Sequence, residues 1–205
     1  MAKLIFWLQV IMACTYTVPQ VIGIISGRTN GLTLALYAIF IVYLVLSLSL
    51  SVASYKLKSD VTRKRTIIIF IQWIIFIGLI LFVGMGKIIW RQNDTIICII
   101  VLCLSLITVF KYHGLKDPFS KAYLAVWCKA IPQVWLACTI VLAGNSDGLP
   151  LITLVSGHIT AIPRLIQILI AGKSGGWDKP TKGLLIGESA NVATWLVVTI
   201  AWAIF

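Results

Sequence analysis

The chain has 205 residues, of which 60% are hydrophobic and 11% charged, and it carries a net charge of +11. Soluble domains carry about a quarter charged residues, so this composition excludes a water-soluble enzyme and a disordered scaffold. At roughly 20 apolar residues per membrane crossing, the length allows six to eight membrane helices and almost nothing outside the bilayer.

Apolar segments taken in chain order predict an all-α integral membrane protein with seven transmembrane helices. Each segment approaches or exceeds the length that crosses roughly 30 Å of hydrocarbon, and the fourth is the shortest. The connections are brief and hold no soluble domain, so we expect the function to reside among the helices. The predicted spans are about 4–25, 32–55, 66–86, 94–111, 121–143, 149–171 and 183–205.

The basic residues lie mostly in the short connections, as orientation signals of membrane proteins do. With seven spans, the N-terminus shares a side with the connections near residues 56–65, 111–121 and 173–182. That side carries twelve Lys and Arg residues, and the other side carries three. The bias predicts a cytoplasmic N-terminus and an outer C-terminus, in a plasma or inner membrane, and it accounts for the positive charge without nucleic acid.

An internal repeat links the first and fifth spans. Pro19-Gln20 recurs as Pro132-Gln133, 113 residues later, and each span ends at a turn bracketed by glycines, at residues 27–31 and 144–148. A three-helix unit starts and ends on opposite sides of a membrane, so repeating it in the same orientation needs one linking span. The repeat therefore predicts two parallel three-helix bundles joined by a linker helix. The bundles comprise residues 1–86 and 117–205, and the linker lies within residues 87–116.

Two Pro-Gln pairs at repeat-equivalent positions in a three-one-three layout resemble the PQ-loop family. Its relatives include the SWEET and SemiSWEET sugar carriers and the lysosomal cystine and cationic amino-acid exporters. The resemblance covers essentially the whole chain and implies two bundles around a central solute site with alternating access. This chain departs from the family in two respects. Many relatives have an outer or luminal N-terminus, and the basic residue Arg28 near the first turn has no counterpart in the second.

The two prolines inside spans are candidate hinges. A proline removes one helical hydrogen bond, and in hydrocarbon the freed carbonyl needs another partner. Gln20 and Gln133, beside Pro19 and Pro132, are placed to bond either the freed backbone or a solute. A fixed kink without a moving role is the alternative interpretation.

Charged residues within spans are expensive in a membrane and usually functional. Lys129, Arg164 and Glu188 all lie in the second repeat. A cavity lined by these side chains suits a zwitterion or an anion, because each charge of the solute meets an opposite partner. The alternatives are snorkelling of a cation to the interface and a simple Lys129–Glu188 ion pair.

Further candidates for the solute site are polar and aromatic. Asn191 and Trp195 form an i, i+4 pair on the helix face that also carries Glu188. In the sugar-carrying relatives an asparagine of this helix lines the solute site. The resemblance therefore implies this role for Asn191. Gln72 and Trp73 are the comparable pair in the third span.

Three titratable residues are candidates for proton coupling: Asp147, Glu188 and His158. A carboxyl that moves between water and a dry cavity can change its protonation, and histidine titrates near neutral pH. Ordinary turn chemistry for Asp147 and a structural role for His158 are the alternatives.

These features predict a carrier of a small polar solute that is not an enzyme and needs no metal or cofactor. The charges within spans favour an amino acid over a sugar. A SWEET-type sugar uniporter and a membrane receptor that binds without transport remain alternatives. No catalytic motif such as His-Glu-x-x-His occurs. Both bundles lie in one chain, so a monomer suffices for a complete cavity, and an oligomer stays open.

Overall fold

A computed structural model describes residues 2–29, 32–146 and 149–205. These residues form seven α-helices and no strand, and each helix is long and apolar enough to cross a membrane. This confirms the predicted all-α class and the predicted number of helices. The helices are α1 (Ala2–Ile25), α2 (Leu34–Leu57), α3 (Val61–Met85), α4 (Gln92–Lys111), α5 (Pro118–Ala143), α6 (Leu151–Gly175) and α7 (Lys179–Ile204).

The outer surface of the bundle is apolar. Phe82, Phe110 and Leu142 are each more than 70% exposed. A helix that is apolar on all sides is stable either inside a large core or in a membrane. The interior contains a continuous apolar cluster with fully buried aromatic side chains such as Tyr37 and Phe70. The surface and the interior are both apolar, as expected of a multi-pass membrane protein.

Three helices begin earlier than their apolar runs predict. The predicted starts at residues 66, 121 and 183 are three to five residues late. In each case an aspartate, Asp60, Asp117 or Asp178, is the N-cap, and its carboxylate accepts from the backbone N–H three residues later at 2.7–3.0 Å. Such a cap satisfies a backbone donor that the helix leaves free. The helix therefore starts in a polar turn that a hydropathy scan assigns to the connection.

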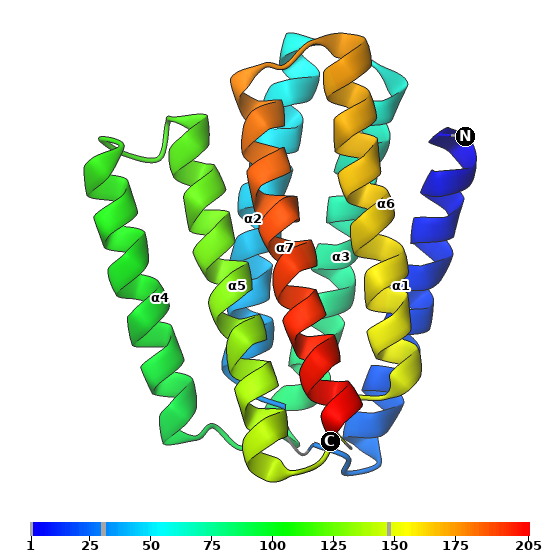
Figure 1. Cartoon of the computed structure of the whole chain (residues 1–205), viewed down its shortest axis with the longest axis vertical. Helices are drawn as coiled ribbons and strands as arrows, with labels where there is room; N and C mark the ends of the chain where they lie inside the picture. Colours follow the sequence, from blue (N-terminus) through cyan, green and yellow to red (C-terminus); the bar gives the residue numbers. More distant parts are fainter. Residues whose placement is uncertain (1, 30–31, 147–148) are drawn as a thin grey trace.

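The helices alternate in direction along the bundle (Figure 1). The N-terminus and the α2–α3, α4–α5 and α6–α7 connections lie at one end, which we call the N-terminal end. The remaining connections and the C-terminus lie at the opposite end. In consequence α1 and α5 run in the same direction.

The packing of the helices follows one pattern in the two halves of the chain, which are α1 to α3 and α5 to α7. α3 packs against both α1 and α2, and α7 packs against both α5 and α6. Over the described residues, the backbone of α1 does not come close to that of α2, and the backbone of α5 does not come close to that of α6. The halves meet where α1 packs on α6 and α2 packs on α5, while α4 lies at the edge against α5 and α2 (Figure 1).

The two predicted hinge prolines lie inside helices that continue past them. Pro19 is half-buried in α1 and Pro132 is buried in α5. The predicted glycine turns are described in part: Gly27 and Gly144 have φ of 81° and 64°, a left-handed conformation that suits glycine. Asp147, the predicted proton-coupling residue of the second turn, lies outside the described residues.

Candidate functional site

A cavity lies near the middle of the bundle, between helices of both halves. The space in it that the centre of a water molecule can occupy is about 40 Å³, room for about three waters at roughly 10–15 Å³ each. Six helices contribute to its wall, α4 being absent. The lining residues are Tyr16, Phe40, Tyr43, Leu44, Trp73, Ile77, Lys129, Gln133, Gly157, Thr160, Ala161, Arg164, Asn191 and Trp195.

A buried ion pair joins α6 and α7 beside this cavity. Nη1 of Arg164 lies 3.5 Å from Oε1 of Glu188, and the two residues are 4% and 1% exposed. The hydroxyl of Tyr43, from α2, donates to the same carboxylate oxygen. Nδ2 of Asn191 donates to Oε2 at 3.1 Å. Three donors therefore hold the Glu188 carboxylate, which explains how its charge is accommodated away from water.

Lys129 approaches the cavity from α5 and has a different environment. Its Nζ lies 3.6 Å from the centre of the Phe40 ring and 5.2 Å from that of Tyr43. Among the described residues it has no ion-pair or hydrogen-bond partner. Glu188 thus pairs with Arg164 rather than with Lys129, in contrast to the simple ion pair considered from the sequence.

A polar chain extends from Glu188 towards the second Pro-Gln pair. Nε2 of Gln133 donates to Oδ1 of Asn191 at 3.2 Å, and the hydroxyl of Thr194 donates to Oε1 of Gln133. Gln133 therefore uses its amide to connect α5 with α7. This arrangement fixes the orientation of Asn191, whose amide faces both Gln133 and Glu188.

Aromatic rings form one wall of the cavity. Tyr16 lies edge-on to Trp73, with 5.1 Å between ring centres, and 6.5 Å from Trp195. The indole N–H of Trp195 donates to the carbonyl of Leu154 at 3.2 Å. Gly157 provides the space for this ring, because a Cβ at that position would lie 2.6 Å from indole atoms. Trp195 is thus held in place by one hydrogen bond and one glycine.

Not all predicted site residues reach the cavity. Lys129, Arg164, Gln133, Asn191, Trp73 and Trp195 line it, and Glu188 contacts three of the lining residues. Gln72, by contrast, is half-buried against α1 and donates to the carbonyl of Val10 at 3.1 Å.

The remaining predicted residues lie outside the cavity wall. His158 is half-buried, and its Nε2 lies 2.6 Å from the hydroxyl of Thr199. Pro19, Gln20 and Pro132 are not among the lining residues. The buried side chain of Gln20 hydrogen-bonds with Tyr37 of α2.

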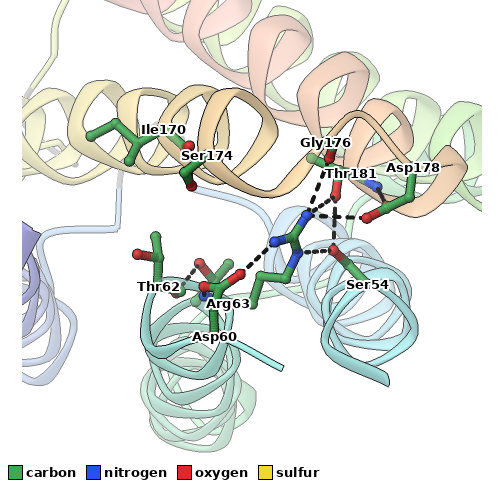
Figure 2. Close-up of polar contacts among 10 residues, drawn as sticks. Ser54, Asp60, Thr62, Arg63, Ile170, Ser174, Gly176, Asp178 and Thr181 are labelled. Carbon is green, nitrogen blue, oxygen red and sulfur yellow. Dashed lines mark hydrogen bonds and ion pairs between the residues drawn. The ribbon is translucent and has the colours of Figure 1, made fainter. Parts of the chain in front are cut away.

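A second polar cluster closes the N-terminal end of the bundle around Arg63 (Figure 2). We call this group of side chains the Arg63 cluster. Arg63 is 3% exposed although the sequence places it in a basic connection. Its guanidinium pairs with Asp60 of its own half and, at 3.1 Å, with Asp178 of the other half. It also donates to Oγ of Ser54 at 2.7 Å and to the carbonyl of Gly176 at 3.3 Å.

The Arg63 cluster joins α2, α3 and the start of α7. The hydroxyls of Ser54 and Thr181 lie 2.8 Å apart, and both accept from the guanidinium of Arg63. Burial raises the pKa of the Asp60 carboxyl, but hydrogen bonds and the charge of Arg63 lower it more, and the pKa ends below its ordinary value. Asp60 therefore stays ionised at neutral pH and maintains its ion pair with Arg63.

A small space lies directly below the Arg63 cluster. About 10 Å³ is available to the centre of a water molecule, enough for about one water. Arg63 and Thr66 of α3 line it together with Ile168 of α6, which is one turn from Arg164 of the central cavity. The two spaces thus follow the same face of α6.

Sequence reasoning missed Tyr43, Gly157 and Arg63. Tyr43 lies in the apolar part of its span, and nothing in the sequence indicates that its hydroxyl reaches a charged residue. For Arg63 the sequence contains a signal. Asp60 lies three positions before Arg63, and Asp178 lies three positions before Thr181, which is the spacing of an N-cap contact. This spacing indicates that Arg63 lies in the first turn of a helix and not in a loop.

Comparison of the chain with protein-family models, with curated proteins and with solved structures finds no match.

Proposed function

We propose that the chain is an alternating-access carrier of the PQ-loop type for a small polar solute. The observation that carries this proposal is the central cavity, which is walled by helices of both halves and contains buried charges. Ionisable residues inside a membrane bundle are expensive and mark solute or ion pathways. A purely structural bundle has no need of Arg164, Glu188 and Lys129 around one space.

The repeat is the second element of the proposal: two parallel three-helix bundles with α4 as linker. In support of it, α3 and α7 each pack between the other two helices of their half. In the repeat, α1 corresponds to α5 and α2 corresponds to α6. The contact between α1 and α6 therefore has its counterpart in the contact between α5 and α2, and both contacts are present. These are the relations expected of a two-fold axis along the membrane normal.

Alternating access requires an end that opens, and the Arg63 cluster is our candidate for the gate at the N-terminal end. It holds α3 of one half to α7 of the other through Asp178. We propose that these contacts break when the solute is exchanged at this end. The excess of Lys and Arg at the same end supports a cytoplasmic location for it.

The charges of the cavity favour a charged solute over a neutral sugar, because a sugar has no negative charge to pair with Lys129. Proton coupling is part of the proposal through Glu188 and His158, the two described candidates. Collapsing an imposed pH gradient is expected to reduce solute accumulation in vesicles. Accumulation that does not respond to the gradient contradicts coupling but leaves the carrier intact.

The proposed function is tested with purified chain reconstituted into proteoliposomes. Vesicles loaded with one unlabelled solute from a panel of amino acids, sugars and small organic acids are given the labelled form outside. A carrier accumulates label by exchange. Asn191→Ala, which removes a side chain that lines the cavity, is expected to lower the exchange rate at least about tenfold. Asn93→Ala is the matched control, because Asn93 is exposed at the start of α4.

A receptor that binds without transport is distinguished by the same vesicles. Solute that stabilises the purified protein against heating, but is never exchanged across the membrane, contradicts the carrier and supports the receptor. If no member of the panel either binds or exchanges, the proposed function is wrong for these solute classes.

A further inference from the structure

The charges around the central cavity do not cancel. Three charged side chains line or touch it: Lys129, Arg164 and Glu188. Arg164 and Glu188 pair with one another, and the carboxylate also receives Tyr43 and Asn191. Among the described residues of the cavity, this leaves the amino group of Lys129 as the basic group without a carboxylate partner.

The ammonium group of Lys129 is the one uncommitted charge of the site. It has three donors, yet within the described part of the chain it makes no hydrogen bond or ion pair and lies over the faces of Phe40 and Tyr43. A ring face attracts a cation modestly. A carboxylate binds it more strongly, because charge-assisted hydrogen bonds are shorter and about twice as strong as neutral ones. The site is therefore complementary to an anion.

A second charge on the solute, in the form of an ammonium group, finds no free carboxylate among the described residues that line this cavity. The carboxylate of Glu188 is 1% exposed and already holds three donors. Two ring faces are occupied by Arg164, whose Cζ lies 5.1 Å from the centre of Phe70 and 5.9 Å from that of Trp73. An incoming ammonium would meet two cations at short range, which is repulsive in a low-dielectric interior.

Part of the remaining wall is apolar and favours a short apolar tail. Leu44 and Ile77 line the cavity together with the ring of Trp195. The available space of about 40 Å³ suits a solute of a few heavy atoms. A carboxylate with one to three carbon atoms attached has both the charge and the size.

We infer that the solute of this cavity is a small organic monocarboxylate, whose carboxylate pairs with Lys129 and whose short tail contacts the apolar wall. The inference deepens the proposed carrier function. It rests on that function, because the bound monocarboxylate is a transported solute only if the chain is a carrier. It replaces the zwitterionic amino acid, which the sequence favours, by an anion without an ammonium group.

Three compounds of nearly equal size test the inference on the purified full chain. L-lactate is a monoanion, L-alanine has an ammonium group in place of its hydroxyl, and L-lactamide has a neutral amide in place of its carboxylate. Titration calorimetry and thermal stabilisation measure binding of each compound. We expect lactate to bind at least about tenfold more tightly than alanine and lactamide. Equal or tighter binding of alanine or lactamide overturns the inference, and so does the absence of lactate binding.

A variant of the lysine locates the anion. Lys129→Gln removes the charge and keeps a polar side chain of similar length, and we expect it to weaken lactate binding at least about tenfold. Lys173→Gln is the matched control, because Lys173 is exposed in the last turn of α6. Lactate affinity that is the same in both variants contradicts the role of Lys129. If Lys129→Gln does not fold, the discrimination among the three compounds by the unmodified chain still decides the inference.

Exchange of labelled lactate and labelled alanine by proteoliposomes separates the inference from the proposed function. Exchange of alanine but not lactate overturns the monocarboxylate and leaves the carrier standing. Lactate that binds to the site but is not exchanged supports the anion site and contradicts the carrier. Exchange of lactate alone supports both.

Discussion

The buried Arg164–Glu188 pair allows the most stringent test of how the site is built. Glu188→Gln keeps the shape of the side chain and removes its charge. Arg164 is 4% exposed, and its Nε already has no partner among the described residues. Removing one member of a buried pair destabilises a protein by about 3–5 kcal/mol, because the other charge stays buried and unpaired.

This free energy translates into a shift of the unfolding temperature. For a chain of 205 residues, 1 kcal/mol corresponds to about 2–4 °C. We therefore expect Glu188→Gln to lower the unfolding midpoint by about 6 °C or more. Arg164→Met leaves the carboxylate with the hydroxyl of Tyr43 and the amide of Asn191, so its effect is expected to be smaller.

The double variant Glu188→Gln with Arg164→Met removes both charges. Replacing a whole buried pair is often neutral, so we expect the double variant to unfold closer to the unmodified protein than Glu188→Gln does. The corresponding interaction energy is expected to reach at least about 2 kcal/mol, within the range seen for residues in one network. Thermal unfolding of detergent-purified protein, followed by circular dichroism, measures all three variants.

Arg28→Met is the control for these measurements, because Arg28 is exposed near the end of α1. Its midpoint is expected to stay within about 1 °C of the unmodified protein. If Glu188→Gln unfolds at the same temperature as this control, or if the two single effects simply add, the buried pair does not stabilise the site as described.

Two further predictions concern the packing of the cavity and the gate. Gly157→Ala places a Cβ 2.6 Å from the Trp195 indole and is expected to destabilise the protein by about 1–3 kcal/mol. Gly78→Ala is the control, because a Cβ at this position meets open space, and it should be neutral or stabilising in thermal unfolding. Equal effects of the two variants contradict the packing role of Gly157. Asp178→Asn removes an ion pair between the halves and is expected to open the N-terminal end, so that a cysteine placed at Thr66 reacts faster with a membrane-impermeant maleimide. An unchanged rate contradicts the gate.

Hydropathy predicts the number of helices because each span must be apolar along its whole length to lie in hydrocarbon. The same scan misplaces the starts of α3, α5 and α7, since their first turns are polar and are initiated by Asp60, Asp117 and Asp178. Arg63 shows the consequence. It lies in such a first turn, where a count of charges treats it as a loop residue, although its guanidinium is paired across the bundle.

The charged part of the candidate site was predictable because a charge is expensive inside an apolar span. Lys129, Arg164 and Glu188 attract notice as charges within apolar spans, and all three lie at the cavity. Their pairing was not predictable, because spacing along the chain does not reveal that Tyr43 of α2 reaches Glu188. Gln72 is the converse case: its polarity suggested the cavity, but its amide bonds the backbone of α1.

The central claim is that one cavity opens to each side of the membrane in turn. Ile77 lines the cavity and is 3% exposed, so a single cysteine at this position, in a variant without the five native cysteines, reports access from either face. We predict that a membrane-impermeant thiol reagent labels Ile77→Cys from the inside and from the outside of oriented vesicles, at rates that solute shifts in opposite directions. Labelling from one face alone, whatever solute is present, contradicts alternating access.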